Sequence, residues 1–385
     1  MAAALLASAA GRGAAQSTGA PDAPAPTAPA PRAEPGTHVA GLPVLSYGSD
    51  VGLQLGGVAY VYGVDARGER ESWVALGVTW TSHGPRSAEL KGELLRIRGT
   101  SLRAFLQLKG AVDTGAPYWG EGAALGAGTS PGAGAPPPPY RYRSEGPWFS
   151  AVVRGDLAGP LGWWTRLRLS DPSVEDPPAL LVRAAPRGLH GGTSGLAHAG
   201  VVYDTRDAAV SPRRGYLADA SAFAAPGPLS SYGFGGLDLG ARWYLPVAAD
   251  ATLAVRALYD LKVGAVPFFE RTLYEGLGYG EGLGGAGTIR GLARDRLMGE
   301  EKALLGAELR AWLAATRWLG RAQEWGVSAG ADAGSARDRG HPAALGLGGF
   351  VGGRLLWDRA VVVRFEVGWA GQGEVAYYLS FDEAF

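Results

Sequence analysis

The sequence predicts an all-β protein: a transmembrane antiparallel β-barrel of sixteen strands, with one long extracellular loop folded into it. Three observations predict this fold. The 385 residues include 62 glycines, 12 tryptophans and 15 tyrosines, a composition that suits strands and tight turns. No apolar run approaches the ~18 residues of a transmembrane helix. Long segments alternate strictly between apolar and polar residues, which is the period of a β-strand.

The alternation also indicates where the strands lie. In a soluble sandwich, strands average about five or six residues, and this is the alternative reading. Here several reach about ten residues with aromatic residues near their ends, which is typical of strands with one face toward lipid and the other toward a lumen. The clearest example has five outward residues opposite two charged ones: Val361, Val363, Phe365, Val367 and Trp369 against Arg364 and Glu366.

Sixteen segments follow this pattern, and 178–186 has the weakest one. An even number places both termini on the periplasmic side. The same parity assigns the proline-rich connection 128–139 to that side. The predicted strands are 50–62, 71–81, 87–97, 101–112, 140–157, 161–170, 178–186, 198–207, 214–225, 232–247, 251–264, 301–315, 321–335, 343–357, 360–371 and 373–383.

The N-terminal region differs in composition. Residues 1–15 contain a short apolar stretch of small residues and resemble a signal peptide, although the basic n-region is missing. An alanine-rich disordered tail is the alternative. Residues 16–40 form a Pro/Ala linker without an apolar face, which predicts disorder. The barrel is expected over 41–385.

Composition and motifs exclude several functions. Without cysteine there is no disulfide, thiolate nucleophile or iron–sulfur cluster. The balance of 36 basic and 36 acidic residues argues against nucleic-acid binding. The five histidines lack metal-ligand spacing. We therefore expect no catalytic residue, metal or cofactor, and no enzyme activity.

One connection stands apart, because about 37 residues separate the strands that end near Val263 and begin near Glu301. Loops of this length are usually functional or disordered. Its glycines, spread over 276–287, permit unusual dihedral angles and suit a loop that folds back into a lumen. Gly280, Gly282 and Gly285 match G-x-G-x-x-G only formally, since no βαβ unit surrounds them.

Three segments together resemble the barrel of the BamA/TamA superfamily, also called the bacterial surface antigen family. They are Gly285–Leu292 (GAGTIRGL), Gly306–Arg310 (GAELR) and Ala331–Gly334 (ADAG). The family tetrapeptide V/I-R-G-F/Y reads Ile289, Arg290, Gly291 and Leu292 here, with leucine in place of the aromatic. A second element resembles Y-D-x-R-D…P-x-x-G and contains Asp204, Arg206, Asp207, Pro212 and Gly215.

The resemblance implies that the loop arginine pairs with acidic residues on lumen-facing strand positions. The alternation supports this independently, because it turns Glu308 and Asp332 inward. We therefore predict that Arg290 contacts Glu308 and Asp332, where a guanidinium offers a planar bidentate partner. The alternative is that all three are ordinary solvated charges. The Asp204–Gly215 element has its own alternative, which is to fix a periplasmic turn.

The resemblance also implies a function in the bacterial outer membrane: assembly, insertion or translocation of proteins or lipids. The predicted route is a weak lateral seam between the first strand, around Leu53–Val61, and the last, Val375–Phe381. Partners would be outer-membrane lipid, unfolded outer-membrane proteins, or a separate POTRA-bearing or periplasmic protein. Insertases of the superfamily carry POTRA domains before the barrel, where this chain has the linker. The alternatives are a passive pore or structural barrel, and an adhesin acting through loops 64–70 and 187–197.

Overall fold

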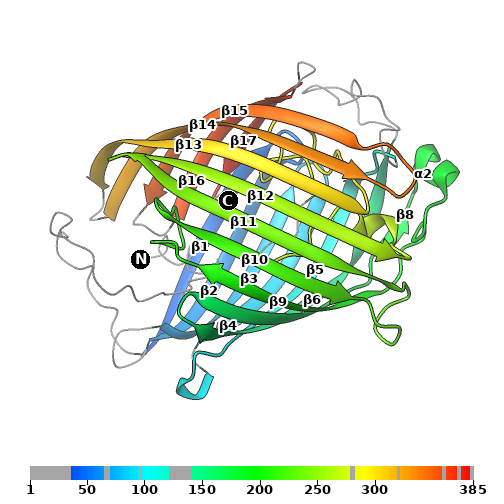
Figure 1. Cartoon of the computed structure of the whole chain (residues 1–385), viewed down its shortest axis with the longest axis horizontal. Coiled ribbons are helices and arrows are strands. Elements are labelled where there is room, and N and C mark those ends of the chain that lie inside the picture. The colour runs from blue at the N-terminus through cyan, green and yellow to red at the C-terminus, as the bar shows by residue number, and fades with distance from the viewer. Residues whose placement is uncertain are drawn as a thin grey trace.

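The computed structural model describes residues 36–64, 70–95, 97–120, 140–277, 282–318, 321–357, 361–370 and 374–381. Within these ranges the chain forms a closed antiparallel barrel of sixteen wall strands (Figure 1), so the predicted fold class is confirmed. The short strand β8 extends the sheet beside β6. The strands are β1 (Gly36–Gly48), β2 (Gly52–Val64), β3 (Arg70–Thr81), β4 (Pro85–Leu94), β5 (Arg103–Pro117), β6 (Arg141–Ala158), β7 (Leu161–Ser170), β8 (Ser173–Glu175), β9 (Ser194–Asp204), β10 (Gly215–Ala224), β11 (Phe234–Ala248), β12 (Ala251–Gly264), β13 (Glu301–Trp318), β14 (Arg321–Arg337), β15 (Ala344–Trp357), β16 (Val361–Ala370) and β17 (Glu374–Ser380).

The number of wall strands agrees with the prediction because two errors cancel. Strand β1 was not predicted and begins at Gly36, inside the segment expected to be a linker. Segment 178–186 was predicted as a strand but contains helix α2 (Ala179–Ala184). Pro178 precedes that helix, a position where a fixed φ and a missing N–H are tolerated. The predicted signal peptide and the linker up to residue 35 lie outside the described residues.

Because β1 was missed, the strand count was shifted by one up to segment 178–186. Each connection before that segment was therefore assigned to the wrong end of the barrel. We call the end of the barrel that carries 171–193 and the long loop 265–300 the loop end (right in Figure 1), and the other the turn end. Residues 128–139, like 65–69, lie outside the described residues. The segment before 128–139 lies at the loop end, since Trp119 Nε1 donates to the Arg294 carbonyl at 3.1 Å. Tyr118 donates its N–H to the Tyr140 carbonyl at 2.8 Å, so both described ends of this connection lie at the loop end, opposite to the predicted side.

Side chains alternate across the wall as predicted. On β13, Leu305 and Leu309 are exposed on the outer face, while Glu308 and Arg310 are buried inside. Aromatic and aliphatic residues dominate the exposed outer positions of the other strands as well. In the described part of the chain, no helix has the length and apolar character needed to cross a membrane.

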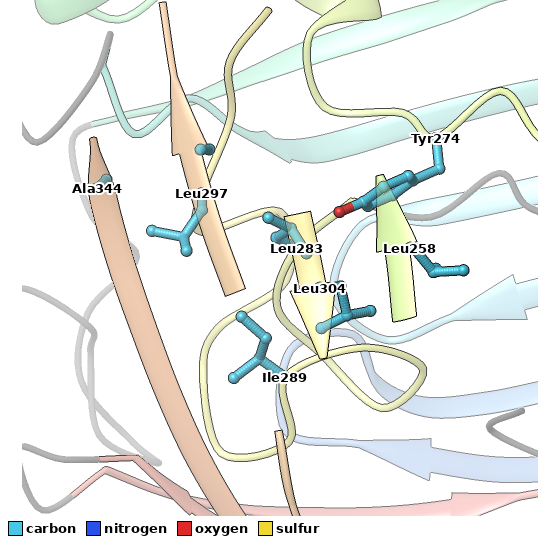
Figure 2. Packing of buried hydrophobic residues seen from close by; sticks show 8 residues of the cluster. Leu258, Tyr274, Leu283, Ile289, Leu297, Leu304 and Ala344 are labelled. Atoms are coloured by element: carbon cyan, nitrogen blue, oxygen red, sulfur yellow. The ribbon is translucent and has the colours of Figure 1, made fainter. Parts of the chain in front are cut away.

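The core lies inside the barrel and consists largely of the long loop packed against the wall. One cluster joins loop residues to inward residues of β12, β13, β14 and β15 (Figure 2). A second cluster closes the loop end, where Phe268 and Met298 pack with Tyr118, Tyr142 and Leu181. The 3₁₀ turn η2 (Phe268–Glu270) and α2 thus belong to one cap over the lumen, and a further 3₁₀ turn, η1 (Ile97–Gly99), lies at the turn end.

The barrel closes between β1 and β17. Among the described residues, only two pairs join these strands, Tyr47↔Leu379 and Gly48↔Tyr378. By contrast, β1 pairs with β2 over its whole length from Gly36 to Gly48. The predicted first strand, Leu53–Val61, belongs to β2 and is paired on both sides, so the position of the first strand was wrong.

Candidate functional site

The tip of the long loop is a compact turn held by one threonine. The Thr288 hydroxyl donates to the Gly282 carbonyl at 2.8 Å and accepts the Gly284 N–H at 2.8 Å. A backbone bond from Gly285 N–H to the Leu292 carbonyl (2.8 Å) closes the turn. Small glycines allow these backbone segments to approach closely. The result presents Ile289, Arg290 and Gly291 to the wall.

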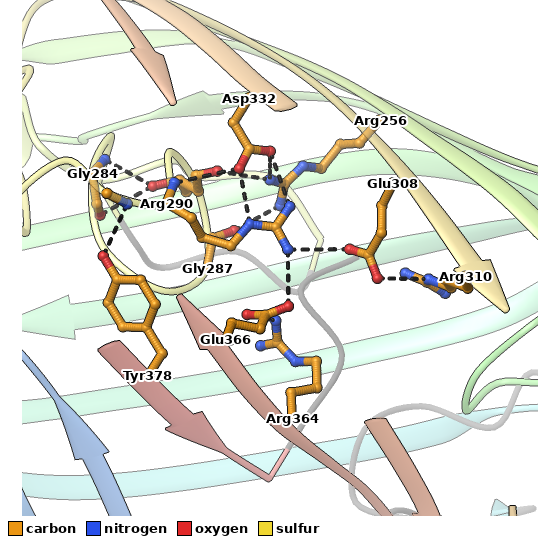
Figure 3. A network of polar contacts seen from close by, with 12 residues as sticks. Arg256, Gly284, Gly287, Arg290, Glu308, Arg310, Asp332, Arg364, Glu366 and Tyr378 are labelled. Atoms are coloured by element: carbon orange, nitrogen blue, oxygen red, sulfur yellow. Dashed lines mark hydrogen bonds and ion pairs between the residues drawn. The ribbon is translucent and has the colours of Figure 1, made fainter. Parts of the chain in front are cut away.

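The structure places Arg290 among three carboxylates inside the barrel (Figure 3). Its Nε and Nη2 donate to the two oxygens of Asp332 at 2.9 and 3.1 Å. Its Nη1 donates to Glu308 at 3.1 Å and to Glu366 at 3.2 Å. The guanidinium also lies 3.2 Å from the ring centre of Phe350. Glu308 and Asp332 were predicted partners; Glu366 and Phe350 were not.

Further arginines share the same carboxylates. Arg310 and Arg354 contact Glu308 at 3.0 and 2.5 Å, and Arg364 contacts Glu366 at 2.8 Å. Arg256 donates to the Gly287 carbonyl at 2.8 Å and so also holds the loop backbone. Buried charges are tolerated when they are paired and hydrogen-bonded. Burial alone would lower the pKa of Arg290, but the three carboxylates raise it above its usual value.

Close backbone contact accompanies the charges. Gly291 has a φ of +97°, and a Cβ there would overlap the Trp369 backbone. A Cβ at Gly348 would overlap the Arg290 carbonyl oxygen, and one at Gly368 would lie 2.6 Å from the Gly291 nitrogen. The loop therefore lies directly on the glycine-lined inner face of β15 and β16.

Apolar side chains fix the tip on its other side. Ile289 is fully buried with Leu283, Leu297 and Leu304 (Figure 2). Leu292 packs against the same cluster. The motif thus combines one charged residue, Arg290, with the apolar residues Ile289 and Leu292 that precede and follow it in the chain.

A second buried ion cluster, which the sequence did not predict, holds the start of the loop. Glu275 contacts Arg166 and Arg168, each at 3.1 Å, and Arg168 also contacts Glu270 at 2.6 Å. Next to it, Lys262 donates to the Leu273 carbonyl at 2.6 Å. The inward positions of Arg166 and Arg168 on β7 were a signal in the alternation, but loop residues 270–275 gave none. The loop is therefore anchored at two points along its length.

The loop residues that follow the motif, around Arg294, lie near the turn between β1 and β2. Arg294 donates to Asp113 at 2.7 Å. Asp50, in that turn, accepts a hydrogen bond from the Arg294 backbone. Burial raises the pKa of the Asp50 carboxyl to about 6, although Arg294 acts to lower it. This position was not predicted, because nothing near Asp50 in the sequence marks it.

The second predicted motif lies at the turn end and does not meet Arg290. Asp204 binds the Arg206 side chain at 2.9 and 2.8 Å. The Asp207 carboxylate accepts hydrogen bonds from the backbone N–H groups of Arg213 and Arg214, which follow Pro212. Gly215 has a φ of +98° and lies close to the Thr205 carbonyl. These contacts fit the alternative in which the motif fixes a turn.

The same turn also packs inside the barrel. Val210 contacts a cluster of inward residues on β13, β15 and β16: Trp312, Leu356 and Val362. Arg213 forms an ion pair with Glu324 of β14 and lies over the Trp312 ring. The turn therefore covers part of the lumen at the turn end.

Residues 192–370, which include β9 to β16 and the docked loop, match the model of the Omp85 superfamily domain. The match covers slightly less than half of the chain. The resemblance predicted from the motifs is confirmed, and so is the location in the bacterial outer membrane. No curated protein sequence is detectably similar to the chain.

Several solved structures share the fold of this barrel. BamA from Haemophilus ducreyi lacking POTRA domains 1–3 has a TM-score of 0.58 and 12% identity, with 91% of this chain and 70% of that chain covered. CdiB from Escherichia coli has a TM-score of 0.57 and 13% identity, with 89% and 62% covered. CdiB from Acinetobacter baumannii has a TM-score of 0.51 and 11% identity, with 90% and 59% covered. The chain thus spans less than two thirds of either CdiB.

Proposed function

We propose that this barrel inserts or translocates polypeptides at the outer membrane through the seam between β1 and β17. The observation that carries the proposal is the pairing of these strands, among the described residues, through only two residue pairs. The match to the Omp85 domain and the fold shared with BamA and CdiB, an insertion and a secretion factor, support it.

A sparse seam has two physical consequences. Each backbone hydrogen bond contributes about 1 kcal/mol net, so a seam with few of them separates at low cost. In the described residues, β17 reaches β1 only at Tyr47 and Gly48, which leaves the edge of β1 from Gly36 to Ser46 open to another strand. An open strand edge binds an incoming strand by β-augmentation. Pro43 is tolerated on β1 for the same reason, since proline is confined to edge strands.

The docked loop disfavours the alternative of an open passive pore. Loop residues fill the lumen near Arg290, and the 205–214 turn covers part of the turn end. Partners in the proposed function are outer-membrane lipid, unfolded outer-membrane proteins and a separate POTRA-bearing or periplasmic protein. The activity consists of strand exchange and transport, without covalent chemistry.

A reversible lock across the seam tests the proposal. The chain has no cysteine, so a Tyr47→Cys/Leu379→Cys pair introduces the only thiols. The full chain in liposomes is given an unfolded β-barrel client, and insertion is measured as protection from protease. Oxidation should abolish insertion and reduction should restore it.

The matched control is a Val351→Cys/Val367→Cys pair, which locks β15 to β16 instead. Its oxidation should leave insertion unchanged. Equal insertion with the β1–β17 seam locked and unlocked would refute the lateral route. Steady bilayer conductance without any insertion would favour the passive pore.

A further inference from the structure

The long loop contacts both edges of the seam with residues that lie close together in the chain. On one edge, the Gly291 N–H donates to the Tyr378 hydroxyl of β17 at 3.2 Å (Figure 3). On the other, Arg294 donates its backbone N–H to Asp50, in the turn that follows β1. Gly285 is also close to Asp50, since a Cβ at Gly285 would lie 3.7 Å from the Asp50 carboxylate. Residues 285–294 therefore bridge β17 and the β1–β2 turn.

This bridge lies over the paired part of the seam. Tyr378 is itself paired with Gly48, and Asp50 follows two residues later. The intervening Ser49 donates its N–H to the Tyr377 carbonyl at 3.1 Å and accepts the Tyr377 N–H at 2.9 Å. The described hydrogen bonds between the two strands and the loop contacts to both strands thus occur at one level of the barrel.

The bridge is held from outside the seam. Arg290 is bound to β13, β14 and β16 through Glu308, Asp332 and Glu366. Arg294 is bound to β5 through Asp113 at 2.7 Å. Separation of β1 from β17 would pull Asp50 and Tyr378 apart while the loop stays fixed to the wall, so at least one loop contact must break.

The burial of Asp50 agrees with this arrangement. A carboxyl group in a short turn at the end of a hairpin is ordinarily solvated. Here the loop covers part of it, and this burial raises its pKa to about 6.

We propose that residues 285–294 act as a strap that keeps the β1–β17 seam closed, with Asp50 and Tyr378 as its two attachment points. The seam then opens when this segment leaves the lumen wall, which couples release of Arg290 to lateral opening. The functional meaning of the strap rests on the proposed role of the seam, whereas its effect on the seam is measurable alone.

Hydrogen exchange read on the strand opposite each substitution tests the strap. Tyr378→Phe removes only the hydroxyl that accepts the Gly291 N–H, and exchange is followed in a peptide from β1. Asp50→Ala removes the other attachment, and exchange is followed in residues 374–380, which form β17. Each variant should accelerate exchange on the opposite strand about tenfold, the change that about 1.4 kcal/mol produces.

The control is Asp171→Ala, an aspartate in another loop-end connection that hydrogen-bonds Thr193 instead. It should leave hydrogen exchange in both seam peptides unchanged. Each test variant should likewise leave exchange in the paired strands β15 and β16 unchanged. Retained heat-resistant migration on gels shows that the barrel has folded, and the conservative Tyr378→Phe keeps the test valid if Asp50→Ala misfolds. Faster exchange in 285–294 without any change on the opposite strand would overturn the strap, as would no change in either.

The same variants separate the strap from the proposed function. If Tyr378→Phe loosens the seam but leaves client insertion unaltered, the strap stands and the lateral route fails. If the locked seam blocks insertion but Tyr378→Phe does not loosen it, the lateral route stands and the strap fails.

Discussion

Replacing Arg290 by alanine should release the loop tip from the lumen wall. The side chain makes four charge-assisted hydrogen bonds to three fully buried carboxylates. Removing one partner of a buried pair costs about 3–5 kcal/mol. Glu308 and Glu366 keep other arginine partners, so most of the cost falls on Asp332, which loses both of its Arg290 side-chain hydrogen bonds and, among the described residues, retains only Arg256 at 3.8 Å as a charged partner. With about 4 kcal/mol lost, the open population of residues 282–297 should rise about 1000-fold. Hydrogen exchange in that segment measures this change directly.

Arg290→Lys separates charge from geometry. Lysine keeps the positive charge but donates from a single nitrogen, so it cannot span Asp332, Glu308 and Glu366 together. We expect the loss for lysine to fall between that for alanine and zero, at about 2 kcal/mol. If lysine behaves like arginine, net charge rather than the bidentate contact holds the loop.

The control for both variants is Arg337→Ala. Arg337 also lies at the loop end and pairs with Glu301, but its side chain is 58% exposed. Exposed pairs contribute about 0–1 kcal/mol, so this variant should hardly change exchange. The reasoning is refuted if Arg290→Ala accelerates exchange in 282–297 no more than Arg337→Ala does. Conductance should rise in parallel with loop release in Arg290→Ala and stay constant in the control.

Three further predictions concern other contacts of the site. Gly291→Ala should also release the loop, because a Cβ at φ +97° is strained and overlaps the Trp369 backbone; unchanged exchange in 282–297 would contradict this. Asp50→Asn should stabilise the barrel above pH 6 by up to about 3 kcal/mol. Because folding raises this carboxyl pKa from 3.8 to about 6, the cost of its charge is absent below about pH 4 and complete above about pH 6. The difference in unfolding free energy between variant and wild type should therefore grow across that window, and a constant difference would refute the assignment. Val210→Ala should lower the free energy of unfolding by about 1 kcal/mol and speed trypsin cleavage in the 205–214 turn. Unchanged cleavage would show that the contact with Trp312 does not hold the turn.

The fold class was predictable because alternation is a local property of the sequence. Segments such as Leu253–Val263 show a period of two whatever surrounds them, so their assignment to strands needed no tertiary information. Strand β1 was missed because Gly41 and Pro43 interrupt its pattern, and an edge strand tolerates such residues. The prediction of a strand at 178–186 was wrong because a short apolar run does not distinguish a strand from a helix. The position of the seam depended on β1 and was lost with it.

Only part of the site was predictable for a related reason. Alternation turned Glu308 and Asp332 inward, and the resemblance supplied Arg290 as their partner. Glu366 and Arg364 also face inward, but inward charges are numerous and the alternation alone does not show which of them the loop reaches. Asp50 and Glu275 meet their partners only after the loop has folded into the lumen, and no local pattern records such a contact.

Backbone contact, as much as charge, sets the depth of the loop. The Arg290 guanidinium reaches three carboxylates on different strands only because its backbone lies against β15 and β16, where Gly348 and Gly368 leave no side chain in the way. The same closeness bears on Leu292, which stands where the family motif has an aromatic residue. A Cβ at Gly346 would lie 3.0 Å from the Leu292 side chain. A side chain at residue 346 would therefore press on Leu292, and glycine at that position lets the loop lie this close to the wall.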